Sequence, residues 1–159
     1  MQWPPVVSNT SPLINLAGIN HLHLLPQLYT TINIPCAVLA EYQTGKEPST
    51  PDLTSFPWLE IIAIEKRDPL VAFRLDEGEA QAITLAIKQN ARLLLLDERR
   101  ARKVASQHGI PIIGTLGILG AAKRLGLIST LRPLIDQMMD QGRYISPTLR
   151  AQVLRSVEE

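Results

Sequence analysis

The sequence lacks the features of a disulfide-rich or membrane-spanning protein. Its 159 residues include one cysteine, Cys36, which excludes an intrachain disulfide and a zinc site built from several thiolates. Aromatic residues make up only 4%, so the core has to be aliphatic. The uncharged stretch 109–122 is interrupted by Pro111 and several glycines. It is also shorter than the roughly 20 apolar residues that a membrane span needs.

The charge is nearly balanced. A net charge of +1 excludes a strong overall field toward nucleic acids, although it leaves room for a local basic patch. The first five residues, Met1–Pro5, lack the basic and apolar regions of a secretory signal. With the single cysteine, this predicts a cytoplasmic protein. The length and the 45% hydrophobic content suit one globular domain over residues 1–159.

Strand-like and helix-like segments alternate along the chain. Apolar, β-branched or leucine-rich runs predict strands at 6–8, 30–34, 59–64, 91–97 and 110–113. Helical patterns lie at 12–17, 21–25, 35–41, 74–90, 98–108, 115–125, 131–139 and 146–157, and a loop is predicted at 45–51. This alternation predicts an α/β fold with a mainly parallel sheet between two helix layers, and the helices in 131–157 pack on it or extend it.

Several helix starts carry a local signal. Ser11 and Thr115 are predicted N-caps, and Ser146 repeats the Ser-Pro start seen at Ser11. Asp76 and Glu79 have the spacing of a capping box at the start of an almost wholly apolar helix.

Four polar residues are predicted to converge at one edge of the sheet. Asn9 and Asp97 each follow a predicted strand, and the carboxyl ends of parallel strands share an edge. Glu41 lies in the helix after the second strand, and Glu79 begins the helix before the fourth. A structural role is an alternative for each of three: an Asx-turn for Asn9, the capping box for Glu79, and an N-cap for Asp97.

Carboxylates in one cleft repel one another unless a cation or a proton neutralises them. The cation that suits oxygen ligands is Mg²⁺ or Mn²⁺. Such an ion can activate water and stabilise an in-line displacement at phosphorus. The four residues therefore predict metal-dependent phosphodiester cleavage.

The most basic run, 98–103, begins directly after Asp97. Arg99 and Arg100 are candidates for holding a phosphate backbone. The alternative is a solvated helix face on which Glu98 and Arg102 form a pair at i, i+4.

Four stretches resemble the PIN-domain family, and a prokaryotic subgroup often treated as VapC-like toxins is the most similar. These stretches are Ser8–Ile14, Leu75–Ala80, Leu95–Ala101 and Gly114–Gly117. The resemblance implies the strand order 3-2-1-4-5 and a Mg²⁺- or Mn²⁺-dependent endoribonuclease. It also implies the toxin of a toxin–antitoxin pair, with an antitoxin partner and often a homodimer.

In this resemblance the family's acidic quartet falls on Asn9, Glu41, Glu79 and Asp97, as catalytic residues and metal ligands. Thr10 or Ser11 matches the hydroxyl that often follows the first acid. Many members carry Asp where this chain has Asn9, so one negative charge is lost and metal binding should weaken. The alternatives are a non-catalytic PIN-like module that binds RNA or an antitoxin, and a phospho-acceptor domain. The latter is disfavoured because no acid pair follows the first strand.

Overall fold

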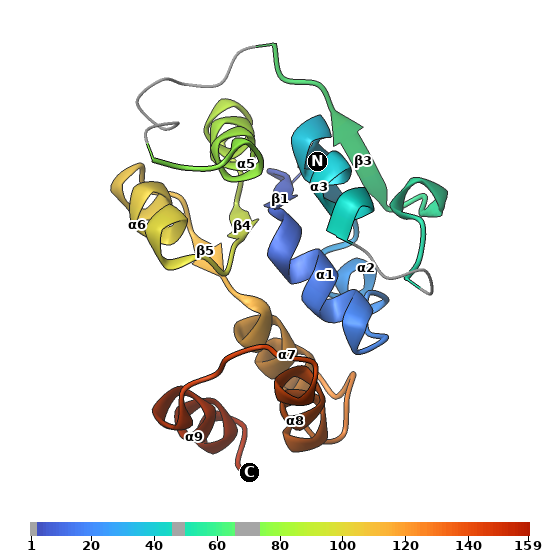
Figure 1. The fold of residues 1–159 in the computed structure, drawn as a ribbon, viewed down its shortest axis with the longest axis vertical. Coiled ribbons are helices and arrows are strands. Elements are labelled where there is room, and N and C mark those ends of the chain that lie inside the picture. Colours follow the sequence, from blue (N-terminus) through green and yellow to red (C-terminus); the bar gives the residue numbers. More distant parts are fainter. Residues whose placement is uncertain (1–2, 46–49, 66–73) are drawn as a thin grey trace.

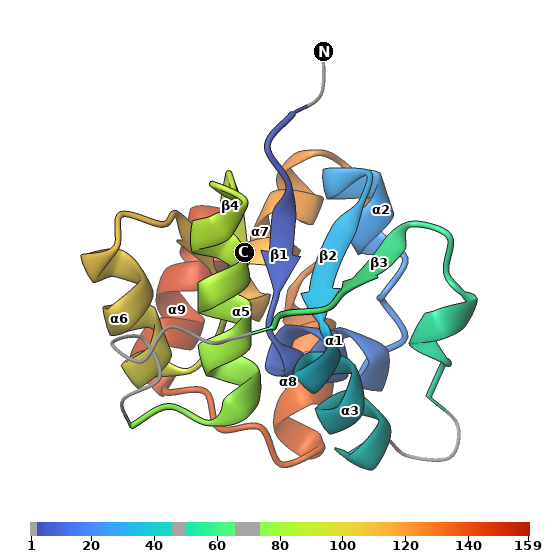
Figure 2. The ribbon, with the colours of Figure 1, turned by 90° about the horizontal axis from the view of Figure 1, so that it is seen from above.

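Five parallel strands form the centre of the protein. The computed structural model describes residues 3–45, 50–65 and 74–159. The strands are β1 (Val6–Ser8), β2 (Ile32–Pro35), β3 (Leu59–Ile62), β4 (Leu93–Leu95) and β5 (Ile112–Ile113). Their order is β3-β2-β1-β4-β5, which confirms the predicted α/β fold and strand order. In Figure 2, which looks down on the sheet from the side of α5, β1 lies between β2 and β4.

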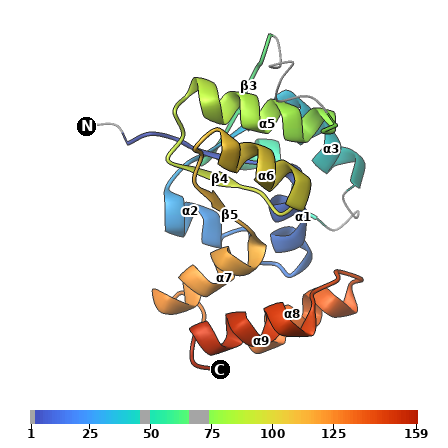
Figure 3. The same cartoon turned by 90° about the vertical axis from the view of Figure 1, so that its left-hand side faces the viewer.

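Helices cover both faces of this sheet. They are α1 (Thr10–Gly18), α2 (Leu24–Tyr29), α3 (Cys36–Gly45), α5 (Glu77–Lys88), α6 (Arg99–Gln107), α7 (Thr115–Arg124), α8 (Arg132–Asp140) and α9 (Pro147–Ser156). A short 3-10 helix spans Leu53–Ser55. Figures 1 and 3 show α5 and α6 on one side of β4 and β5, α7 on the other side, and α8 and α9 beyond α7. Among the described helices, none is long and apolar enough to cross a membrane.

The central strands are buried on both faces, as a parallel sheet covered by two helix layers requires. Val7 of β1 lies opposite Asn33 of β2 and Leu94 of β4, and Val7 and Leu94 are fully buried. Ser8 pairs with Leu95, and the backbone N–H of Asn9 donates to the Leu95 carbonyl at 2.9 Å. This register brings the residues that follow β1 and β4 to the same edge.

Several predicted element boundaries are wrong. Helix α1 begins at Thr10 with Asn9 as its N-cap, not after Ser11, because the chain turns directly at the end of β1. Helix α2 starts at Leu24, after the histidine-containing stretch that was predicted as helix. Pro35 ends β2 rather than opening α3, since Pro35 is paired with Ile62.

Other boundaries are confirmed. The capping box of Asp76 and Glu79 is present, and Ser146 accepts a hydrogen bond from the Leu149 N–H. Gly109 and Gly126 have positive φ angles of 71° and 75°, as residues that follow a helix end often do. The predicted loop at 45–51 lies mostly outside the described residues.

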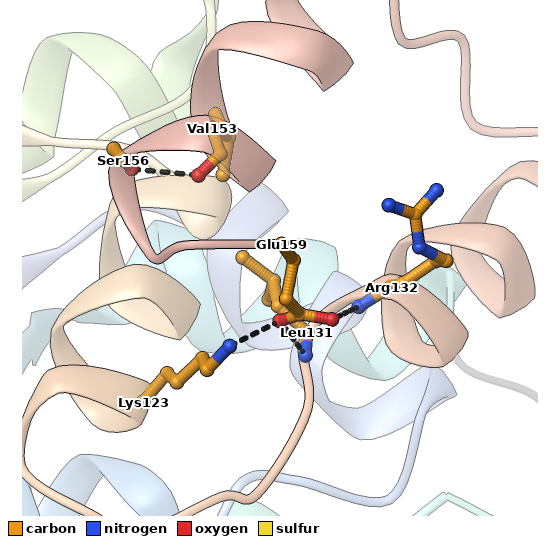
Figure 4. Close-up of polar contacts among 6 residues, drawn as sticks. All are labelled: Lys123, Leu131, Arg132, Val153, Ser156 and Glu159. Atoms are coloured by element: carbon orange, nitrogen blue, oxygen red, sulfur yellow. Dashed lines mark hydrogen bonds and ion pairs between the residues drawn. The ribbon is translucent and has the colours of Figure 1, made fainter.

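The C-terminal helices are fastened to the rest of the chain by Glu159 (Figure 4). Its carboxylate accepts from Lys123 Nζ at 2.8 Å and from the N–H groups of Leu131 at 2.6 Å and Arg132 at 3.2 Å. The hydrogen bond from Lys123, followed by those from the two backbone N–H groups, lowers the pKa of Glu159 to about 2 although burial opposes the shift. One side chain therefore joins the end of α7, the start of α8 and the residues after α9.

Candidate functional site

Asn9 lies at the carboxyl end of β1 and carries a buried oxygen that nothing in the described chain satisfies. Its side chain is 3% exposed, and Oδ1 has no hydrogen-bond partner among the described residues. Asn9 occupies the N-cap position of α1 without making the side-chain cap bond. An unsatisfied buried acceptor costs about 1–3 kcal/mol. A bound cation, or water held by one, would supply the missing partner.

The carboxylate of Glu41, from α3, is held in a fixed orientation. Thr10 Oγ1 donates to Glu41 Oε2 at 2.7 Å, and the Gly78 N–H donates to Oε1 at 2.9 Å. Gly78 is buried, and a Cβ there would collide with both carboxylate oxygens. The approach of Glu41 to α5 therefore requires glycine at position 78.

Glu79 completes the capping box and also faces other acids. Its N–H donates to Asp76 Oδ1 at 2.7 Å, and its Oε2 accepts from the Asp76 N–H at 3.2 Å. Burial and the charge of Asp76 raise the pKa of Glu79, the hydrogen bond from the Asp76 N–H opposes them, and the charges of Glu98 and Glu41 raise it further. Negative charge from three different elements therefore gathers around Glu79.

Asp97 caps a helix, but not the one that follows it in sequence. Its Oδ1 accepts from the Thr115 N–H at 2.7 Å, and its Oδ2 accepts from Thr115 Oγ1 at 2.6 Å and Asn15 Nδ2 at 3.2 Å. Asp97 thus binds the first turn of α7. Thr115 is not the N-cap that the sequence predicted: Gly114 holds that position, and its side-chain-free Cα leaves room for Asp97.

The structure brings the predicted residues together in two groups at one sheet edge. One group contains Thr10, Glu41 and Glu79, and the other contains Asn15, Asp97 and Thr115. Asn9 is the N-cap of α1, and α1 contributes Thr10 to the first group and Asn15 to the second. Within the described ranges, no three carboxylate, histidine or cysteine side chains are placed to hold one ion.

By donor type, though not as one preformed cluster, these residues suit a hard cation that keeps part of its water shell. A carboxylate offers about four lone pairs, and Glu41 uses two of them on protein donors. Mg²⁺ is commonly bound by one or two carboxylates and completed by water and substrate phosphate. Glu41, Glu79, Asp97 and Asn9 Oδ1 supply oxygen donors only, which suits Mg²⁺ or Mn²⁺.

The predicted substrate-binding residues differ in whether their side chains already make hydrogen bonds. The Thr10 hydroxyl already donates a hydrogen bond to Glu41. Ser11 Oγ makes a long contact of 3.4 Å with Glu98 Oε1. Arg99 is exposed on α6, and Arg100 Nη1 donates to the Arg74 carbonyl at 3.3 Å.

The alternative prediction of a Glu98–Arg102 ion pair is wrong for the described structure. No ion pair joins the two side chains there, because Glu98 turns toward Ser11. Arg102 Nη1 instead lies 3.4 Å from the point that a Gly114 Cβ would occupy, beside Asp97.

Sequence reasoning missed the supporting residues of the site. No local pattern marks Asn15 as part of it, and Gly78, Glu98 and Gly114 stand out only as parts of longer motifs. Their partners lie far away in sequence, with 82 positions between Asn15 and Asp97 and 37 between Gly78 and Glu41. The available signal is weak: a glycine inside a capping box, and a polar residue on the first turns of α1.

Comparisons with known proteins agree with this architecture. No curated protein is significantly similar to the chain. A solved structure, a PilT N-terminus domain protein from the hyperthermophilic archaeon Sulfolobus solfataricus P2, aligns with a TM-score of 0.56 and 19% identity. The alignment covers 74% of this chain and 92% of that one, and at this identity it shows the fold alone. The PIN-domain family matches residues 5–159, so the chain belongs to that family, whose members are generally nucleases.

Proposed function

We propose that this protein is a Mg²⁺- or Mn²⁺-dependent endoribonuclease that cleaves phosphodiester bonds in RNA. The observation that carries the proposal is the buried, unsatisfied Oδ1 of Asn9 at the sheet edge that also holds Glu41, Glu79 and Asp97. A buried acceptor needs a partner, and a cation attracted by the carboxylates of this edge would supply one.

The residues of the chain hold and orient this site. Glu41 is aimed by Thr10 and Gly78, and Asp97 by Thr115 and Asn15, so neither carboxylate has to reorganise when a ligand arrives. Burial and the neighbouring negative charges oppose the ionisation of Glu79, and a bound cation would relieve the repulsion between those charges. When bound here, the metal supplies Lewis acidity toward a phosphate oxygen and lowers the pKa of water. In this proposal Ser11 and the exposed Arg99 contact the phosphate backbone.

Cleavage of single-stranded RNA by the purified protein in Mn²⁺ tests the proposal. Asp97→Asn should abolish cleavage, whereas Asp140→Asn, an exposed acid at the end of α8, should cleave like the wild type. Circular dichroism of both variants checks that they stay folded. Equal cleavage by the wild type and Asp97→Asn would reject the site.

The proposal extends to a toxin role, with an antitoxin as partner, a homodimer and action in the cytoplasm. The resemblance to VapC-like toxins supports these points. Light scattering of the purified chain tests the dimer. Relief of growth inhibition by the product of a neighbouring reading frame tests the toxin role.

A non-catalytic module that binds RNA or an antitoxin is the second candidate. Its supporting observation is the neutral Asn9 together with the absence, among the described residues, of three acids close enough to share an ion. Calorimetry with Mn²⁺ separates the two candidates: no heat of binding beside intact RNA binding would favour the module.

A further inference from the structure

A cavity of about 440 Å³ opens directly beside Asp97. Three of its lining residues, Asn15, Asp97 and Thr115, are those that form one half of the acidic site. Another part of the wall comes from α6 and from the connection between α8 and α9, and it includes Arg102, Arg143 and Tyr144. The cavity is therefore continuous with the site but built largely by the C-terminal part of the chain.

Two guanidinium groups in this wall have no acidic partner. Arg102 and Arg143 are both exposed, and within the described residues neither side chain makes an ion pair or a hydrogen bond. Arg150 of α9, by contrast, pairs with Asp136 at 2.7 Å. Two free cations next to a carboxylate site favour a polyanion that reaches from one to the other.

Tyr144 adds an aromatic surface to the same wall. It is 88% exposed, while its neighbour Ile145 is buried at 6% and anchors the segment in the core. Gly142, with φ +91°, turns the chain after α8, and the Arg143 N–H donates to the Met138 carbonyl at 3.1 Å. The segment is thus held by its backbone while it presents a cation and a ring to solvent. A free ring beside cations is the arrangement on which single-stranded nucleic acids stack their bases.

We propose that this cavity binds single-stranded RNA beside the scissile phosphate, with a base stacked on Tyr144 and phosphates held by Arg102 and Arg143. The inference rests on the proposed ribonuclease function and assigns the residues that hold the strand beside the cleaved bond; a duplex, whose bases are already stacked and paired, has no base free to stack on Tyr144. An acidic peptide would satisfy the arginines but would leave the exposed ring without a planar partner, so RNA is the better match.

Binding is measured in EDTA, where a metal-dependent enzyme leaves the RNA intact. Fluorescence anisotropy follows a labelled RNA decamer on the full chain. Tyr144→Ala should weaken binding about tenfold, since stacking on one ring contributes roughly that factor. Tyr144→Phe keeps the ring and should bind like the wild type. Trp3→Ala, which removes another exposed aromatic, at 75% exposure, outside this cavity, is the matched control and should change nothing.

The arginines are tested by salt dependence. Arg143→Ala should reduce the slope of log K against log salt by about 0.7 for each phosphate that the variant no longer neutralises. Arg132→Ala, an exposed arginine at the start of α8 that does not line the cavity, should leave the slope unchanged. Thermal melts check that every variant is folded.

The outcomes separate this inference from the proposed function. Wild-type binding by both Tyr144→Ala and Arg143→Ala overturns the inference, even if the enzyme cleaves RNA. So does equal binding of duplex RNA. Competition by a glutamate-rich peptide that both variants weaken equally would assign the cavity to a protein partner and also overturns it. Variant-sensitive RNA binding without any cleavage in Mn²⁺ supports the inference and refutes only the proposed enzyme.

Discussion

The carboxylate of Glu41 lies against the Cα of Gly78, in the space that any larger side chain would fill. The same carboxylate accepts the Gly78 N–H at 2.9 Å, so one glycine both makes room for the acid and orients it. This contact joins α3 to the first turn of α5 and depends on the absence of a single methyl group.

Gly78→Ala should therefore displace Glu41. Alanine normally stabilises a helix relative to glycine by roughly 0.5–1 kcal/mol. Here we expect a net destabilisation of about 1–3 kcal/mol from overpacking, measured by urea denaturation, together with loss of Mn²⁺-dependent cleavage. Gly45→Ala, whose Cβ would meet its nearest neighbour at an ordinary 3.5 Å, is the control and should be close to neutral. A stabilised, active Gly78→Ala would contradict the proposed role of the contact.

Asn9→Asp should restore the negative charge that many members of the PIN-domain family carry at this position. Without metal, the new carboxylate is buried without a partner of opposite charge, so the melting temperature should fall by several degrees. With Mn²⁺, it should rise more than that of the wild type, because a tighter ligand stabilises the folded state further. Asn20→Asp, on an exposed turn with φ 59°, controls for the change of charge. The same response to Mn²⁺ in both variants would show that no cation reaches Asn9.

Glu79 should make stability depend on pH. Its pKa is raised, first by burial and then by Asp76, so the folded chain holds this proton more tightly than the unfolded chain does. Its contribution to stability is complete below the ordinary glutamate pKa of 4.5 and is lost as the pH rises through the raised value. Glu79→Gln keeps a capping side chain and removes the charge. At pH 7 without metal the variant should melt slightly higher than the wild type, and the difference should vanish near pH 4.

Glu159 should give stability the opposite dependence on pH. Its pKa is lowered to about 2, chiefly by the hydrogen bond from Lys123, so its stabilising effect is present above 4.5 and is lost as the pH falls toward 2. Glu159→Gln should lower the melting temperature by a few degrees at pH 7, with a shrinking difference in acid. Glu158→Gln, an exposed neighbour, is the control. A constant difference across this pH range would exclude the ion pair as its cause.

The sequence predicted the main elements well because their signals are local. The leucines before Asp97 do form a buried central strand, and the spacing of Asp76 and Glu79 does form a capping box. Boundaries were less accurate where two signals competed. Ser11-Pro12 has the composition of a helix start, but the turn at the end of β1 places the start two residues earlier, at Thr10.

For the candidate site, too, some features follow from local sequence signals and others only from the tertiary structure. The sequence alone determined the α/β alternation, the edge at which Asn9 and Asp97 meet, and the acidic character of that edge, because each follows from periodicity and the direction of parallel strands. Only the tertiary structure decided which donors hold each carboxylate and which glycines make room for them. It also decided that Arg143 and Tyr144, more than forty positions after Asp97, face the same cavity. Those relationships arise from packing between elements distant in the chain, and no local pattern of residues encodes them.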